Sequence, residues 1–177
     1  LRGRRGTEHL ATSPVPAGAR LVVLDAGVVP LPTPLDLLGL PRHYRVGPAD
    51  RPAGHETAVH RVATAEGAGL TPFAPAHLTA QRTGDGAIHA AWIRRTRIGG
   101  ESWQGLDVPL GEAREAYRLR ILAGGQELRR IETTTPAATY TAAQQAADGA
   151  AGALTLRVAQ LSDIRGAGPE TEVTVDG

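Results

Sequence analysis

Short segments in which apolar and polar residues alternate dominate the last hundred residues of the chain. The alternation is clearest over 88–93, 117–121, 154–158 and 172–175. A period of two is the pattern of a strand with one buried face, because successive side chains point to opposite sides of a sheet. Glycines such as Gly124 and Gly125 separate these segments and are typical of tight turns. The pattern therefore predicts an all-β fold.

The spacing of these segments predicts the domain organisation. About seven short strands within roughly 100 residues are typical of an immunoglobulin-like sandwich, which we place at residues 76–177. Residues 1–75 are richer in proline, and we interpret them as a small, irregular β domain with Pro-rich loops. Within them we expect a hairpin over 21–31, a short helical turn over 35–40 and a strand over 57–64.

Composition excludes several classes of protein. The chain has no Cys, so disulfides and thiolate metal sites are ruled out, and its formal net charge of +1 argues against specific nucleic-acid binding. No stretch approaches the roughly 20 apolar residues of a transmembrane helix, so we predict no transmembrane segment. Because the chain contains no Met, we expect it to be either a processed chain or, as we favour, part of a longer one.

Catalytic and metal sites are not indicated by the sequence. The six histidines lack the local spacing of a metal pair, and His55 and His60 would point to opposite faces of a strand. Glu112 and Glu115, with Asp107 nearby, are the nearest acidic pair, and we interpret them as solvated loop residues. We therefore predict no catalytic residue, no metal site and no cofactor, and expect that the chain is not an enzyme.

Binding residues are indicated by one cluster. Arg94, Arg95 and Arg97 form the strongest local charge feature, and Trp103 follows in a glycine-rich connection. Guanidinium groups bind carboxylates and phosphates with two parallel hydrogen bonds. These arginines are either a solubilising strand end or a contact with a neighbouring subunit or an anionic glycan. Trp103 is either a stacking platform for a sugar or a lid over the core.

Residues 76–177 resemble a fibronectin type III domain. Trp92 stands where that family has the Trp of its second strand, and Tyr117 where it has the Tyr of its third strand. The run 154–159, followed by Gly166-Ala167-Gly168, is similar to the sixth strand and its turn. The family's Tyr near the start of that strand is replaced by Leu154 or Thr155, so we expect no tyrosine-corner hydrogen bond.

A narrower resemblance covers nearly the whole chain. It is similar to the C-terminal region of the large baseplate protein of gene transfer agents and related phages, which is also called the megatron or host-specificity protein. Six motifs carry the resemblance in order. They are His43-Tyr44-Arg45-Val46-Gly47-Pro48, Leu70-Thr71-Pro72-Phe73-Ala74-Pro75, Trp92-Ile93-Arg94-Arg95-Thr96-Arg97, Val108-Pro109-Leu110-Gly111-Glu112, Thr139-Tyr140-Thr141-Ala142 and Val158-Ala159-Gln160-Leu161-Ser162.

This resemblance implies a structural component of a phage-like tail tip that contributes to host-cell contact and DNA delivery. It implies a homotrimer with other baseplate and tail proteins as partners, a host surface glycan as a further partner, and assembly in the bacterial cytoplasm into a released particle. The alternative is a carbohydrate-binding accessory module of a cell-surface or secreted glycosidase. Sandwiches of this kind serve many functions, so the fold alone does not decide between the two.

Overall fold

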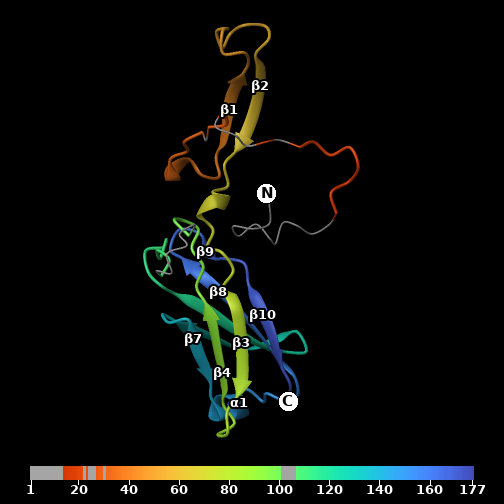
Figure 1. Ribbon diagram of the computed structural model, residues 1–177, viewed down its shortest axis with the longest axis vertical. Helices are drawn as coiled ribbons and strands as arrows, with labels where there is room; N and C mark the ends of the chain where they lie inside the picture. The colour runs from red at the N-terminus through yellow and green to blue at the C-terminus, as the bar shows by residue number, and fades with distance from the viewer. Residues whose placement is uncertain (1–13, 22, 24–26, 30, 101–106) are drawn as a thin grey trace. The chain divides into compact units, whose positions relative to one another are not determined.

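The protein consists of two compact units in a computed structural model that describes residues 14–21, 23, 27–29, 31–100 and 107–177 (Figure 1). One unit comprises residues 15–69, and Leu70–Gly177 form the other. The boundary that we predicted, between residues 75 and 76, stays a prediction. Part of the hairpin expected over 21–31 lies outside the described residues, and the described residues of this segment form no strand.

The unit of Leu70–Gly177 is a sandwich of two antiparallel sheets. One sheet has the order β3-β4-β7, and the other has the order β10-β8-β5-β6, with the short β9 paired to β8. The strands are β3 (Ala76–Arg82), β4 (Ile88–Ile93), β5 (Tyr117–Ala123), β6 (Gln126–Thr133), β7 (Ala137–Tyr140), β8 (Leu154–Ser162), β9 (Gly166–Ala167) and β10 (Thr171–Val175). One sheet has three strands and the main path of the other has four, and the C-terminal strands β8 and β10 belong to the four-stranded path. Fibronectin type III domains have this arrangement. The predicted fold class, all-β with a sandwich of this type, is confirmed.

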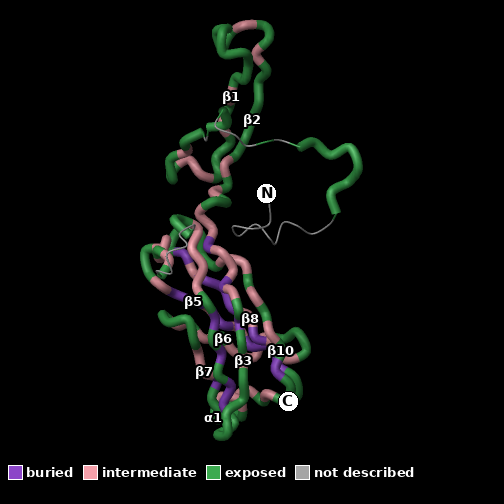
Figure 2. The backbone as a smooth tube through the Cα atoms, viewed as in Figure 1, coloured by how far each residue is buried: buried purple, intermediate pink, exposed green. Residues whose placement is uncertain are grey.

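The core of the sandwich follows the alternation seen in the sequence. In β4, Ile88, Ala90 and Trp92 are buried while the residues between them are exposed. In β5 and β8, every second residue over 117–121 and 154–158 is buried and the residues between them are partly buried. Trp92 packs edge-on against Tyr117, with 5.2 Å between the ring centroids. An edge-to-face aromatic pair adds about 0.5–1.5 kcal/mol to the stability beyond the area it buries. Figure 2 shows the buried residues inside the sandwich.

The outer face of the larger sheet is a network of ion pairs. Arg120 on β5 stands directly across from Arg130 on β6 and from Arg157 on β8. These like charges are held apart by glutamates: Arg120 contacts Glu127 and Glu170, and Arg157 contacts Glu172 at 2.9 Å. The guanidinium of Arg120 is the main cause that lowers the pKa of Glu127. This face is therefore charged but locally neutralised.

A single helical turn closes the end of the sandwich. Helix α1 (Ala142–Ala147) follows β7 and begins with a capping box, in which the Thr141 hydroxyl accepts from the Gln144 N–H and the Gln144 amide accepts from the Thr141 N–H. After the helix, Asp148 accepts two hydrogen bonds from Arg129 and one from the Tyr140 hydroxyl. Arg129 is the larger cause of the lowered pKa of Asp148.

Strands β3 and β10 lie side by side although they belong to different sheets (Figure 1). At one end, the Thr171 hydroxyl donates to the carbonyl oxygen of Pro75. At the other end, Arg82 Nε donates to the carbonyl oxygen of Asp176 at 3.1 Å. Gly168 lies against the Pro72 carbonyl so closely that a Cβ there would come within 2.6 Å of its oxygen. The first and last strands of the sandwich are thus joined by a hydrogen bond at each end.

The unit of residues 15–69 is built around one hairpin. Strands β1 (Pro41–Val46) and β2 (Val59–Thr64) pair antiparallel, and the 3-10 turns η2 (Leu35–Leu37) and η3 (Ala68–Leu70) flank the hairpin in the chain. The helical turn expected over 35–40 and the strand expected over 57–64 are both found, whereas β1 was not predicted. No described residue in this unit is buried, as the green and pink tube of Figure 2 shows. A two-stranded ribbon without a core is at best marginally stable in water.

Candidate functional site

The predicted binding cluster begins with Arg94, which is turned toward its own chain. Its Nη2 donates to Asp107 at 3.0 Å and to the carbonyl oxygen of Val108 at 2.9 Å. Its Nε lies 3.8 Å from Glu115, and its side chain is only 12% exposed. The guanidinium therefore fastens the connection that follows β4 onto the sandwich.

Arg97 makes a second fastening in the same connection. Its Nε donates to Glu112 and its Nη2 to the carbonyl oxygen of Gly111, both at 2.8 Å. The Glu112 side chain is nearly buried, so this ion pair is shielded from solvent. Removing either partner would leave a charge with little solvation, which is costly. Arg97 thus has a structural partner within the chain.

Arg95 and Trp103 complete the predicted cluster. The Arg95 guanidinium lies over the Phe73 ring, 5.1 Å from its centroid, in a cation–π contact. Trp103 lies outside the described residues. The structure brings the three arginines to one connection but gives each a contact within the chain. Their role toward a subunit or a glycan stays a prediction.

The acidic residues near this connection are also engaged. Asp107 and Glu112 pair with the arginines described above, and Glu115 accepts a hydrogen bond from the Tyr117 hydroxyl at 2.7 Å. Burial, followed by this hydrogen bond, raises the pKa of Tyr117 well above its usual range. Among the described carboxyl groups, the pKa values of Asp85, Glu127 and Asp148 are lowered, each chiefly by a hydrogen bond. A carboxyl group that acts as a general acid near neutral pH requires a raised pKa instead.

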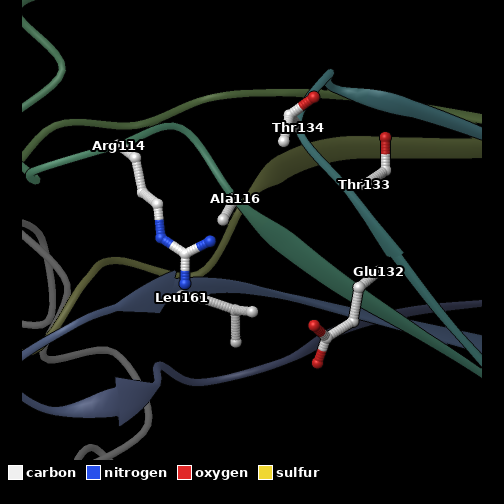
Figure 3. A pocket seen from close by; sticks show the side chains of 6 residues that line it. All are labelled: Arg114, Ala116, Glu132, Thr133, Thr134 and Leu161. Carbon is white, nitrogen blue, oxygen red and sulfur yellow. The ribbon is translucent and has the colours of Figure 1, made fainter.

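An open pocket of about 370 Å³ lies at one end of the larger sheet (Figure 3). Figure 3 shows the Arg114 guanidinium and the Glu132 carboxylate on two sides of it, with Leu161 and Ala116 between them. Arg114 is 3.1 Å from Asp163, and Glu132 is 3.2 Å from Arg118. Because its charges are balanced, this pocket has no marked preference for a cationic or an anionic ligand.

Two histidines come together that the sequence did not pair. His43 on β1 and His60 on β2 are diagonal neighbours across the hairpin, with 2.9 Å between His43 Nδ1 and His60 Nε2 and stacked rings. In the described part of the chain, no group of three or more His, Asp or Glu side chains could hold a metal ion. Arg45 stands directly across from His60, and its charge opposes cation binding at the pair.

The arginines of the hairpin differ from those of the sandwich. Arg42 lies over the Tyr44 ring at 5.7 Å, and neither Arg45 nor Arg61 makes an ion pair with another described residue. Neither strand of the hairpin contains an acidic residue. Arg45 and Arg61 of the hairpin strands therefore have no carboxylate partner among the described residues, a local feature that the net charge of the whole chain does not reveal.

Comparisons with known proteins find similarity in structure but not in sequence. No family model matches the chain, and no curated protein is similar to it. The extracellular region of rat CD45, domains d3-d4, covers 93% of this chain and 79% of its own, with a TM-score of 0.46 and 9% identity. The FN5 domain of Drosophila Lar covers 59% of this chain and 95% of its own, with a TM-score of 0.36 and 18% identity.

Helices in the described residues are short. None of them is long and apolar enough to cross a membrane.

Proposed function

We propose that this chain is a structural interaction module of a phage-like tail tip, where it contributes to host-cell contact and DNA delivery. The observation that carries the proposal is the unit of residues 15–69, in which no described residue is buried. Val46, Val59 and Val62 of its hairpin are 48–56% exposed. A ribbon with two open faces and exposed valines gains stability only when another surface covers it.

An assembly supplies such a surface. In a baseplate of several copies, the hairpin of one chain packs against a neighbouring copy or another tail protein. The sandwich is the part of each chain that has a packed core. The ordered motifs described above support a tail tip over other assemblies, and they support a trimer around the tail axis.

The test is to label purified particles with an antibody against residues 76–177 and to view them by electron microscopy. We expect label at one end of the tail only. The protein recovered free or at the cell envelope, with no particle carrying label, would contradict the proposal and favour the secreted glycan-binding module. Cross-linking of labelled particles then measures the copy number, for which we expect three.

A further inference from the structure

A small pocket lies at the base of the loop that joins β1 to β2. Its volume is about 130 Å³, and it is lined by Arg45 at the end of β1, by Arg51 in the loop and by Thr57, with Pro48 and Pro52 among the apolar walls. The two guanidinium-bearing residues thus come from different parts of the hairpin and share one cavity. All residues of this pocket belong to the unit of residues 15–69.

The loop is held in shape by its own backbone. The Arg51 N–H donates to Pro48, the His55 N–H to Pro52, and the Ala58 N–H to His55, at 2.9–3.2 Å. Gly47 lies so close to Ala58 that a Cβ on it would be 3.2 Å from the Ala58 Cα. Proline fixes its own backbone angle φ, which further limits the loop. These hydrogen bonds and close contacts define the shape of the loop that lines the pocket.

The charge of the pocket is not balanced by the residues that line it. No acidic residue lines it, and Arg45 has no ion pair within the described chain. The nearest carboxylate to Arg51 is that of the adjacent Asp50, 3.7 Å away, and both side chains are more than half exposed. Such a surface pair contributes little and is easily exchanged for another anion. The pocket therefore favours a carboxylate, sulfate or phosphate group.

The volume of the pocket and the residues that line it limit the kinds of ligand that fit. A volume of 130 Å³ is below the roughly 300–1,000 Å³ of sites that enclose a whole drug-sized ligand, so the pocket fits one charged group and part of a ring. Its proline and alanine walls suit the C–H face of a sugar. No aromatic side chain lines it, so it lacks the stacking platform on which nucleobases bind.

We propose that this pocket binds an anionic sugar residue of an acidic polysaccharide, through Arg45 and Arg51. Arg42 and Arg61, on the opposite face of the ribbon by the strand register, add positive charge for the rest of a long polymer. The proposal goes beyond the tail-tip function and holds whether or not the chain belongs to a particle.

The experiment measures binding of the full 177-residue chain to polygalacturonate by isothermal titration calorimetry. The matched ligand is methyl-esterified polygalacturonate, which has the same backbone without the charges. We expect binding to the acid form and at least about tenfold weaker binding to the ester, because each lost charge-assisted hydrogen bond removes that much affinity. Equal binding to the two forms would overturn the proposal.

Variants locate the site. Arg45→Gln and Arg51→Gln should each weaken polygalacturonate binding about five- to tenfold. Arg157→Gln is the matched control, because it removes the same charge from an ion-paired position on the sandwich, and it should change binding less than twofold. Circular dichroism checks that each variant is folded. Pocket variants that bind as well as the control would contradict the proposal.

Two further ligands test whether the pocket prefers another kind of polyanion. A thymidine oligonucleotide and vesicles containing phosphatidylglycerol are compared with polygalacturonate at equal concentrations of negative charge. We expect the polysaccharide to bind more tightly than either, and only its binding to depend strongly on Arg45 and Arg51. If the oligonucleotide or the vesicles bind more tightly, and if that binding depends equally on Arg45, the proposed polysaccharide ligand is wrong and that partner takes its place. Failure of this proposal leaves the antibody labelling of particles unaffected.

Discussion

The sandwich and the hairpin unit use the same amino acids in opposite ways. In the sandwich, apolar side chains are buried and the arginines on β5, β6 and β8 are paired with carboxylates. In the hairpin, valines of similar type are exposed, and Arg45 and Arg61 have no carboxylate partner among the described residues. One part of the chain therefore has a buried core of its own, whereas the other exposes groups that a neighbouring molecule can contact.

Hydrogen exchange should give the largest contrast between the two regions. In the isolated chain, we expect amides of β5 and β8 to exchange more than about a thousandfold more slowly than those of β1 and β2, because core strands open only on global unfolding. Mass spectrometry of peptides from each region measures this. Strong protection of β1 and β2 in the isolated chain would mean that something already covers the hairpin in solution.

A cavity in the core should cost the sandwich far more than the same change costs the hairpin. Leu156 is fully buried, so Leu156→Ala should lower the free energy of unfolding by about 2–5 kcal/mol. Val62→Ala, at a side chain that is 54% exposed, should change it by less than about 0.5 kcal/mol. Urea unfolding followed by far-ultraviolet circular dichroism, to which the strands of both units contribute, compares the two. Similar losses at both positions would contradict the assignment of the core.

Alkaline pH should weaken the sandwich through its buried tyrosines. Burial, followed by the hydrogen bond to Asp148, raises the pKa of Tyr140 to about 12. A raised pKa in the folded state gives stability that is complete below pH 10, the ordinary tyrosine value, and that is lost as the pH rises toward 12. We expect the urea midpoint to fall over this window. Tyr140→Phe should reduce the fall of the urea midpoint over this window. An unchanged pH profile in that variant would show that Tyr140 does not cause the fall.

Acid should also weaken the sandwich through the same cluster. The Arg129 guanidinium, followed by the Tyr140 hydroxyl, lowers the pKa of Asp148. A lowered pKa gives stability that is present above the ordinary value near 3.9 and is lost as the pH falls through the folded-state value. The urea midpoint should therefore fall less steeply below pH 4 in Asp148→Asn than in the unmodified chain. Equal slopes would show that this carboxylate is not coupled to folding.

The smallest effect should come from single surface charges. Arg157→Gln breaks an ion pair with Glu172 whose side chains are 39% and 61% exposed, so the loss of stability should be less than about 1 kcal/mol and should shrink in 1 M NaCl. Arg61→Gln, which breaks no ion pair in the described chain, should have no measurable effect on unfolding. A loss above 1 kcal/mol in Arg61→Gln would reveal a partner for that side chain.

The same contrast explains what the sequence could and could not predict. Residues 88–93 and 154–158 were predicted as strands because burial of one face imposes alternation on the sequence. Strand β1 was missed because its sequence, with Pro41, Arg42 and Arg45, shows no alternation of apolar and polar residues, although Arg42 and Tyr44 are partly buried. The His43–His60 pair depends on the strand register across a 12-residue loop, which local spacing does not reveal.

The candidate site was harder to predict than the fold. The sequence located Arg94 and Arg97 in a charged segment but could not show that Asp107 and Glu112, more than ten residues away, bind them. Long-range partners of a flexible side chain leave no periodic pattern. The unpaired arginines of the hairpin were hidden for a related reason, because a net charge does not show which arginines have a carboxylate partner.

The contacts between β3 and β10 have a mechanical consequence. The two strands run in the same direction, with Pro75 beside Thr171 and Arg82 beside Asp176. A pull applied at Pro75 and Asp176 therefore acts along both strands. Sliding one strand past the other has to break the contacts at both ends together, rather than one after another. The sandwich is suited to transmit tension along its length, whatever molecules are attached to it.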